Sequence, residues 1–133
     1  MAVDNLREKG LAEAAKRMSR EAEEGKIVSY IHAEGRIGVL VEVNCETDFV
    51  ARTQEFKDLA HMLAMQITAM APTCITEDEL PKDDDVEPQN ACLMLQPYIK
   101  DPSLSIKDLI METIAKVGEN IRIARFTRYE LGA

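Results

Sequence analysis

The chain has 133 residues, of which 46% are hydrophobic and 30% are charged. This length fits one domain with a core that needs neither disulfides nor a metal. The 24 acids and 16 bases leave a net charge of -8, which argues against nucleic acid and against an anionic membrane as the main partner, because phosphate surfaces attract an excess of lysine and arginine.

The chain shows no sign of export or membrane insertion. Its apolar runs are far shorter than the roughly 20 residues that span a bilayer, and no basic start followed by an apolar stretch marks a secretion signal. Cys45, Cys74 and Cys92 are an odd number of cysteines without a short pairing motif. This usage fits a reducing compartment rather than a disulfide scaffold.

Residues 4–25 are expected to be helical. Gly10 interrupts them, which predicts that a first helix ends after Leu6–Lys9 with Gly10 as the residue beyond its last turn. A narrow, alanine-rich apolar stripe then continues at helical spacing from Leu11 to Ala22. This stripe can cover the edge of a core but cannot form a core alone.

Residues 26–44 are expected to form a β-hairpin. The turn is expected at Glu34-Gly35, because glycine accepts the positive φ that a two-residue turn requires. Leu40 lies on the second face of the return strand, which indicates that the back of the hairpin is partly covered. The first face carries the alternating apolar residues of that strand, Ile37, Val39, Val41 and Val43.

Two amphipathic helices are expected after the short segment 45–52. The first ends before Pro72, and its apolar stripe follows a 3.6-residue period. The second begins at a capping box made by Ser105 and Asp108 and ends at Gly118. The first stripe consists of Phe56, Leu59, Ala60, Leu63, Ile67 and Met70.

Between these helices, residues 77–87 carry seven acids and one lysine, so they hold -6 of the net charge of -8. This stretch predicts a solvated loop. Ile121–Leu131 is expected to be a last strand, in which a slip of the alternation near Ala124 predicts a bulge or burial on both faces. The expected fold class is α+β, a three-stranded antiparallel sheet packed against helices and preceded by a helical linker.

No catalytic, cofactor or metal motif is recognisable. Phosphate-binding glycine loops are absent, and His32 and His61 lack the spacing of metal ligands, which favours surface positions for both. The acidic run Asp83-Asp84-Asp85 lacks the alternating ligands and the central glycine of a calcium loop. These patterns predict a protein that is not an enzyme, with no catalytic residue, cofactor or metal.

Three features of the sequence each have two possible interpretations. Cys45 is either a buried structural thiol, which the nearby acids favour, or a reactive one. The methionines at 62, 65 and 70 either pack in the core, which is favoured, or form a soft binding surface. Phe49 is either a hydrophobic staple that fixes a helix entry, which is favoured from the residues alone, or an exposed anchor that inserts into a partner.

A long contiguous run, Gly35–Arg52, reads GRIGVLVEVNCETDFVAR. It resembles the signature of the translation elongation factor Ts family, the nucleotide-exchange factors of elongation factor Tu. Residues 6–17 resemble the end of the N-terminal module of that family and the linker after it. Residues 114–132 resemble its C-terminal strand. The resemblance covers most of the chain except about residues 73–92.

The resemblance implies a partner-binding site and a mechanism. In the family, the Thr-Asp-Phe turn docks on the GTPase domain and its phenylalanine wedges between helices near the Mg²⁺ site, which implies that Phe49 is exposed. Asp48 would orient the turn or bond the partner. The remaining candidate partner-binding residues are Thr47, Val50 and Arg52 beside the turn, and His32 and Gly35 in the hairpin.

The resemblance also implies a domain organisation. Residues 1–25 would be a helical linker left from the N-terminal module, and residues 26–133 the core or dimerisation domain. Most of the N-terminal module and a charged helical excursion between the two core helices have no counterpart here. Single-core members are expected to dimerise, so the expected partners are elongation factor Tu and a second copy, without nucleic acid or membrane.

Two further alternatives follow from the same resemblance. The chain is expected either to catalyse nucleotide exchange or to be a structural or dimerisation module that keeps the fold without autonomous exchange activity. The C-terminal tail from Arg122 to Gly132 is similar to cyanobacterial and plastid members. This similarity leaves a bacterial cytoplasm and a plastid stroma both open as the compartment.

Overall fold

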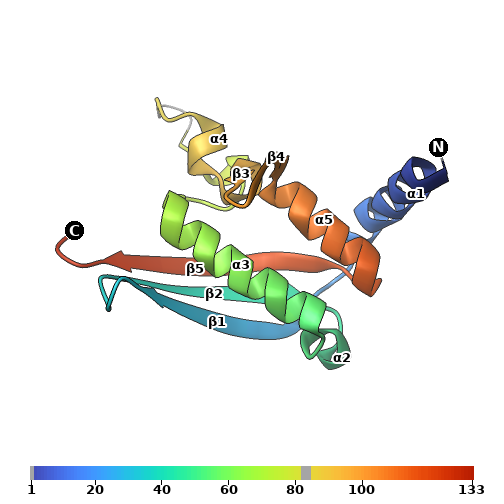
Figure 1. Ribbon diagram of the computed structural model, residues 1–133, viewed down its shortest axis with the longest axis horizontal. Coiled ribbons are helices and arrows are strands. Elements are labelled where there is room, and N and C mark those ends of the chain that lie inside the picture. The colour runs from blue at the N-terminus through green and yellow to red at the C-terminus, as the bar shows by residue number, and fades with distance from the viewer. Residues whose placement is uncertain (1, 82–84) are drawn as a thin grey trace.

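Three strands form an antiparallel sheet in the order β1-β2-β5, and the helices α3 and α5 cover one of its faces in the computed structural model (Figure 1). The structure describes residues 2–81 and 85–133. The elements are α1 (Ala2–Arg17), β1 (Glu24–His32), β2 (Ile37–Cys45), α2 (Asp48–Ala51), α3 (Gln54–Met70), η1 (Glu77–Glu79), α4 (Pro88–Ala91), η2 (Leu93–Leu95), β3 (Pro97–Tyr98), β4 (Asp101–Ser105), α5 (Ile106–Val117) and β5 (Ile121–Glu130). The predicted α+β class with its three-stranded antiparallel sheet is confirmed.

The N-terminal helix α1 runs through Gly10 without interruption, so the prediction that Gly10 ends a first helix is wrong. A Cβ atom at Gly10 would lie 3.8 Å from the Cβ of Ala115. Glycine at this position therefore lies where α1 packs against α5 and does not act as a cap. The expected helix to residue 25 is also too long, because α1 ends at Arg17.

The hairpin of β1 and β2 pairs Glu24 with Cys45 at one end and His32 with Ile37 at the other. Four residues connect the strands, two more than the predicted Glu34-Gly35 turn. Ala33, Glu34 and Gly35 all have positive φ, at 52°, 59° and 90°. The predicted hairpin is therefore confirmed, but its turn is longer because three successive residues adopt left-handed backbone conformations.

The last strand β5 pairs with β2 and contains the predicted irregularity. Glu42 pairs with Arg125 and the next residue, Val43, pairs with Ile123, so Ala124 is an extra residue in the ladder. A β-bulge of this kind shifts the side-chain alternation by one residue. The slip in the sequence pattern is thereby explained.

The two long helices bury the predicted apolar stripes against the sheet. The predicted capping box is present at the start of α5, and Gly118 ends that helix in a left-handed conformation. Met70 departs from the prediction, because it is 43% exposed; Met62 packs against the core and Met65 is half-buried, so core packing describes the three methionines only in part. The largest fully buried apolar residues are Phe56, Leu63, Ile67, Leu93, Ile106, Ile110, Ile114 and Ile121, each contributing about 1.5–3 kcal/mol by burial.

The segment between the long helices contains more structure than its sequence pattern indicates. The described part of the acidic stretch is exposed as predicted, whereas Lys82, Asp83 and Asp84 lie outside the described residues. After it, η2 and the strands β3 and β4 pack against α5. Gln66 donates to Gln96 Oε1 at 3.2 Å and accepts from the Ile99 amide at 2.9 Å. These hydrogen bonds of the buried Gln66 side chain attach the segment to α3. Such polar contacts leave no trace in the hydrophobic periodicity of the sequence.

Gly25 provides a test of the sheet register. An added Cβ atom would lie 2.0 Å from the Val43 carbonyl oxygen, and the φ of Gly25 is 144°. We therefore expect Gly25→Ala to lower the free energy of unfolding by about 3 kcal/mol, measured by urea denaturation. Gly35→Ala is the matched control, because its φ is 90° but no atom lies within 4 Å, and it should cost about 1 kcal/mol. Equal losses in the two variants would contradict the close approach at Gly25.

Candidate functional site

The β2–α2 turn, residues 45–49, leads from the central strand into a one-turn helix. Thr47 is the N-cap of α2, and its hydroxyl oxygen accepts a hydrogen bond from the Val50 amide at 3.4 Å. Thr53 caps α3 in the same way, through the Phe56 amide at 3.2 Å. Two threonine caps in close succession therefore fix α2 as a separate short helix between β2 and α3.

Phe49 projects from this turn into solvent. Its side chain is 81% exposed, the largest exposure among the large hydrophobic residues that the structure describes. On the inner side of α2, Val50 and Ala51 are 8% and 2% exposed. A staple would bury Phe49 against its helix, so that interpretation is wrong and the predicted exposure is confirmed.

The charged neighbours of Phe49 also lie at the surface. Asp48 and Arg52 form an ion pair one helical turn apart, and their side chains are 57% and 70% exposed. Exposed pairs of this kind contribute little to stability, so both groups remain available to a partner. Val50 is also among the predicted binding residues, but its side chain is buried and anchors α2. The predicted contact between Val50 and a partner is therefore disfavoured.

Glu119, which the sequence did not indicate, holds the β2–α2 turn in place. Its carboxylate accepts hydrogen bonds from the Glu46 amide at 3.2 Å, the Thr47 amide at 2.9 Å and the Thr47 hydroxyl at 2.7 Å. Hydrogen bonds to an ionised group are stronger than neutral ones. The Thr47 hydroxyl donates its proton to Glu119, and its oxygen accepts the hydrogen bond that caps α2. The Thr47 side chain therefore links the start of α2 to the α5–β5 connection.

The carboxylate of Glu46 makes the corresponding contact in the opposite direction, from the β2–α2 turn to the α5–β5 connection. Glu46 accepts a hydrogen bond from the Asn120 amide at 2.6 Å and lies 3.7 Å from the Arg20 guanidinium. The Asn120 side chain in turn donates to the Arg20 carbonyl oxygen. Glu46 and Glu119 therefore each bind the backbone of the other's loop. Because the two are 73 residues apart, only the fold reveals this reciprocal pair.

Cys45 lies under the same turn. Its thiol is fully buried and donates to the Thr47 carbonyl oxygen at 3.1 Å. Burial, and next the Glu119 carboxylate, raise the pKa of Cys45 to about 11 from its ordinary 9.0. The burial and the hydrogen bond confirm the predicted structural role of Cys45. A thiol with a pKa raised in this way is scarcely ionised at neutral pH.

This pKa predicts how stability changes with pH. The unfolded thiol ionises above pH 9, whereas the folded thiol keeps its proton until about pH 11. The folded state therefore binds more protons across this window, so the free energy of unfolding falls as pH rises from 9 to 11. Urea denaturation under reducing conditions should give a smaller fall for Cys45→Ala than for the native chain. Equal slopes would contradict the raised pKa of Cys45.

The other predicted site residues, His32 and Gly35, lie at the opposite end of the hairpin (Figure 1). The nine residues of β2 separate the two ends by roughly 26 Å at 3.3 Å per residue. His32 is exposed, its Nδ1 lies 3.1 Å from the Tyr30 hydroxyl, and the two rings stack. His61 is exposed as well, and its ring and that of Tyr30 form a T-shaped pair. The structure thus divides the predicted binding residues between two ends of one sheet.

The described residues contain neither a cluster of metal-binding side chains nor a helix that could cross a membrane. Within residues 2–81 and 85–133, no group of three or more His, Cys, Asp or Glu side chains is arranged to hold a metal ion. Of the acidic run that the sequence singled out, Asp83 and Asp84 fall outside these ranges. No helix in the described part of the chain has the length and apolar character that crossing a membrane requires.

Comparison with known proteins gives one consistent match. A family model described as elongation factor TS matches residues 2–88. The elongation factor Ts of Carboxydothermus hydrogenoformans is 45% identical over 161 positions that cover 98% of this chain and 74% of that protein. The elongation factor Ts of Thermotoga maritima is 47% identical, with 98% and 80% covered. That of Fervidobacterium nodosum is 43% identical, with 98% and 82% covered.

The alignment with the Carboxydothermus hydrogenoformans protein is longer than this chain. Its 161 positions exceed the 133 residues of the chain by 28. The relative therefore carries at least that many additional positions inside the matched span. This difference agrees with the expectation that a segment present in the relatives has no counterpart here.

Proposed function

Because the chain belongs to the elongation factor Ts family, we propose that it is a guanine-nucleotide exchange factor for elongation factor Tu in translation elongation. The observation that carries this proposal is Phe49, an exposed aromatic ring on a turn that Glu119 holds by three hydrogen bonds. An aromatic side chain presented by an ordered turn loses little conformational entropy when it binds, which is typical of interface anchors.

The mechanism acts on the nucleotide site of the partner. Elongation factor Tu holds GDP through phosphate-loop amides and a bridging Mg²⁺. Phe49 inserts between partner helices near that metal, which loosens the metal and the phosphate loop and releases GDP. Because the coupling between the two ligands is reciprocal, bound GDP must weaken the binding of this chain by the factor by which the chain weakens GDP binding.

The remaining binding residues have supporting roles. Asp48 and Arg52 flank Phe49 as an exposed pair, so either can exchange its partner within the chain for one on elongation factor Tu. Thr47 orients the turn through its bonds to Glu119. His32 and Gly35 form a second, more distant contact at the hairpin tip. No covalent bond forms or breaks in this activity, so the proposal includes no catalytic residue and no cofactor.

Release of a fluorescent GDP analogue from elongation factor Tu tests the proposal. The complex is mixed with the native chain and an excess of unlabelled GDP, and the loss of fluorescence is followed in a stopped-flow instrument. The rate should rise with chain concentration and then saturate. A rate that stays at the spontaneous value up to high micromolar concentration would contradict autonomous exchange and favour a structural or dimerisation module.

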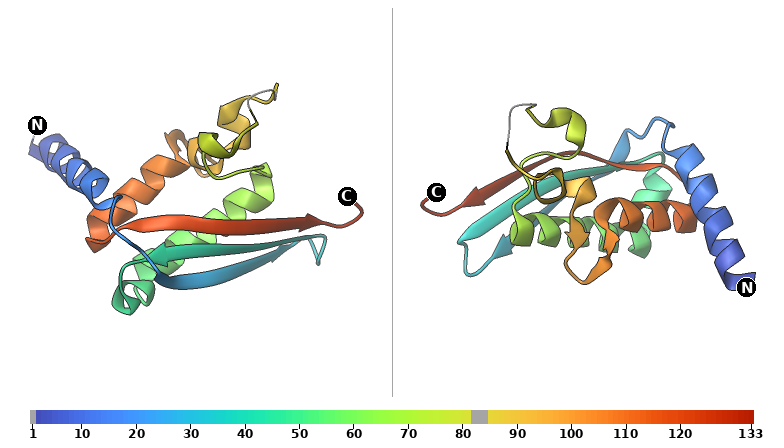
Figure 2. Two further views of the ribbon diagram at one scale, coloured as in Figure 1. Left: turned by 180° about the vertical axis from the view of Figure 1, so that it is seen from behind. Right: turned by 90° about the horizontal axis from the view of Figure 1, so that it is seen from above.

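We further propose that the chain forms a homodimer through the uncovered face of its sheet, seen from behind in Figure 2. None of the described helices crosses this face. Large apolar side chains are exposed there to between 49% and 73%, and Gly38 leaves room for Ile31, whose Cδ1 lies 3.2 Å from the position of a Cβ. Apolar patches of this kind mark interfaces, and a two-fold axis pairs a face with itself. The patch consists of Ile27, Ile31, Leu40 and Tyr129.

Antiparallel packing of two such faces explains the divided site. In that arrangement, the hairpin tip of one copy lies at the same end as the β2–α2 turn of the other. His32 and Gly35 of one copy and Phe49 of its partner then face one molecule of elongation factor Tu. The dimer thus supplies the two contact regions that a single sheet holds apart.

Leu40→Asp tests this interface. An aspartate in the centre of the paired faces would be desolvated without a partner, so we expect the dimer dissociation constant to rise by about 100-fold, measured by sedimentation equilibrium. Gln89→Asp is the control, because Gln89 is exposed on α4, away from the sheet. A native chain that stays monomeric at high micromolar concentration, or an equal effect of both variants, would contradict the proposed dimer.

The proposed domain organisation follows from the same premise. Residues 1–25 form the linker that continues from the N-terminal module of the family, and residues 26–133 form the core that binds elongation factor Tu. The proposed compartment is a bacterial cytoplasm or a plastid stroma, where translation by elongation factor Tu takes place. Neither nucleic acid nor a membrane is part of the proposed activity.

A further inference from the structure

Cys74 and Cys92 form a thiol pair between the long helices, outside the site described above. Their Sγ atoms lie 3.4 Å apart, and both side chains are buried. The backbones pair as well, as an isolated parallel bridge in which the Leu93 amide donates to the Cys74 carbonyl oxygen at 2.9 Å. Paired backbones lie about 4.8 Å apart, within the range of Cα separations in disulfides. The Sγ contact and the spacing of the paired backbones therefore both fit a disulfide between Cys74 and Cys92.

We propose that Cys74 and Cys92 are a redox-sensitive pair, which hydrogen peroxide converts into an intramolecular disulfide. The third cysteine is excluded by its position, because Cys45 lies under the β2–α2 turn and its thiol donates to the Thr47 carbonyl oxygen. The acidic stretch lies within the 17 residues that the disulfide would enclose, residues 75–91. The modification therefore constrains the loop in which most of the net charge is concentrated.

The chemistry proceeds in two balanced steps. The thiolate of Cys74 attacks one oxygen of hydrogen peroxide, which breaks the O–O bond, releases hydroxide and leaves a sulfenic acid. The thiolate of Cys92 then attacks the sulfur of Cys74, forms the S–S bond and expels a second hydroxide. With the two protons that the thiols lose, both hydroxides become water. Cys74 is the first to react, because it is 6% exposed whereas Cys92 is fully buried.

The environment makes this reaction slow. Burial, and next the hydrogen bond with Cys74, raise the pKa of Cys92 to about 11. Cys92 is therefore scarcely ionised at neutral pH, which slows its attack on Cys74, whereas the thiols of fast redox sensors are acidic and exposed. The pair therefore responds to sustained oxidation, and the disulfide stabilises the fold by restricting the unfolded chain.

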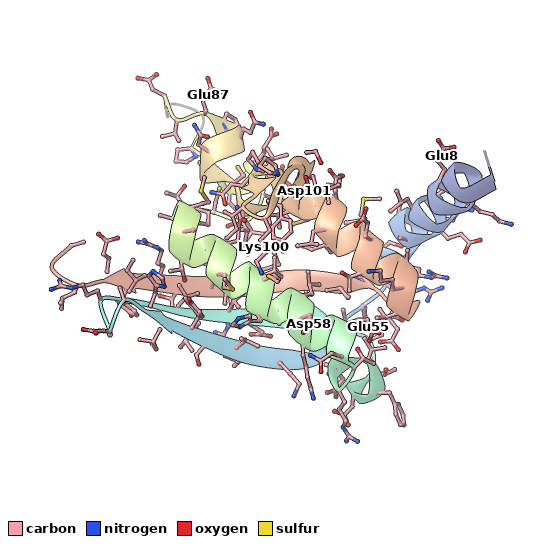
Figure 3. All side chains as sticks on the ribbon, in the orientation of Figure 1. Glu8, Glu55, Asp58, Glu87, Lys100 and Asp101 are labelled. Carbon is pink, nitrogen blue, oxygen red and sulfur yellow. The ribbon has the colours of Figure 1, made fainter. Side chains whose placement is uncertain are left out.

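The disulfide should leave the β2–α2 turn unchanged. The thiol pair lies near α4, where Figure 3 labels Glu87, whereas Glu55 marks the start of α3 beside α2. These two places are at opposite ends of α3. We therefore expect the oxidised chain to melt about 10 °C above the reduced chain, while its GDP-release activity stays within twofold.

Alkylation after oxidation tests the pair. The folded chain is treated with hydrogen peroxide, the peroxide is removed, and the chain is unfolded in guanidinium and alkylated with N-ethylmaleimide. Intact mass spectrometry should find one alkyl group, on Cys45, in place of the three that the reduced chain takes. Peptide mapping should find Cys74 linked to Cys92. Cys45→Ala should still form this link and take no alkyl group.

Two variants and two outcomes decide the proposal. Cys74→Ser and Cys92→Ser should each melt at the same temperature with and without peroxide, in contrast to the native chain. If either variant fails to fold, the peptide map of the native chain still provides the test. Three alkylated thiols after prolonged oxidation, or a link that involves Cys45 or a second chain, would overturn the proposal.

Discussion

Phe49→Ala should lower the acceleration of GDP release by about 30-fold or more, because truncation of a central aromatic anchor at an interface costs at least 2 kcal/mol. The loss should appear in the maximum rate, measured by stopped flow with saturating chain, if the ring disturbs the nucleotide site after docking. Phe49→Leu should give an intermediate rate, because leucine keeps part of the apolar volume.

Stability separates this effect from misfolding. The ring of Phe49 is 81% exposed, so the alanine variant should melt within about 2 °C of the native chain. Val86→Ala is the matched control, since Val86 is an exposed apolar residue far along the chain from the turn. Unchanged GDP release in Phe49→Ala would reject the wedge role of this residue.

Glu119→Ala should weaken both the fold and the activity. The substitution removes the acceptor of three hydrogen bonds and leaves the amides of Glu46 and Thr47 and the Thr47 hydroxyl without their partner. We expect the free energy of unfolding to fall by about 2 kcal/mol in urea denaturation. We also expect the rate of GDP release to fall by about tenfold, because the turn no longer holds Phe49 in one orientation.

The backbone amide of Thr47 reports directly on whether Glu119 holds the turn in place. Its hydrogen exchange, followed by NMR, should be protected in the native chain and fast in Glu119→Ala. Glu55→Gln is the control for removal of a carboxylate, since Glu55 is exposed at the start of α3 near the turn (Figure 3). Fast exchange of the Thr47 amide together with an unchanged rate of GDP release would contradict the role of Glu119.

The elements that short-range patterns define are predicted well. The apolar stripe of α3 repeats at helical spacing, and the capping box at Ser105 and Asp108 marks the start of α5. The slip near Ala124 reveals the bulge, because a strand has only two faces and an extra residue exchanges them. These features depend on residues within a few positions of one another, so one sequence suffices to find them.

The wrong or missing assignments depend on tertiary contacts. Gly10 is a typical helix terminator by propensity, but packing of α1 against Ala115 extends the helix through it. Residues 88–105 contain three prolines and no clear period, yet the hydrogen bonds of Gln66 with Gln96 and Ile99 attach them to α3. In both places a contact across a long sequence separation overrides the local preference.

Some residues of the candidate site can be predicted from the sequence, and others cannot. Thr47, Asp48 and Phe49 lie in one contiguous run that resembles a known signature, and the exposure of Phe49 follows that resemblance. Glu119 lies 72 residues from Thr47, and nothing in its local sequence points to the turn. Residues that bind a partner can be recognised from a short motif, whereas the residue that positions the motif is visible only in the folded chain.

A double-mutant cycle between Phe49 and Glu119 tests most directly whether an ordered presentation of Phe49 drives nucleotide release. GDP release from elongation factor Tu is measured with the native chain, Phe49→Ala, Glu119→Ala and the double variant, each at saturating concentration. If Glu119 acts by positioning Phe49, its substitution should change the rate by less than about twofold once the ring is absent. Independent losses that multiply, with about another tenfold lost in the Phe49→Ala background, would contradict the mechanism.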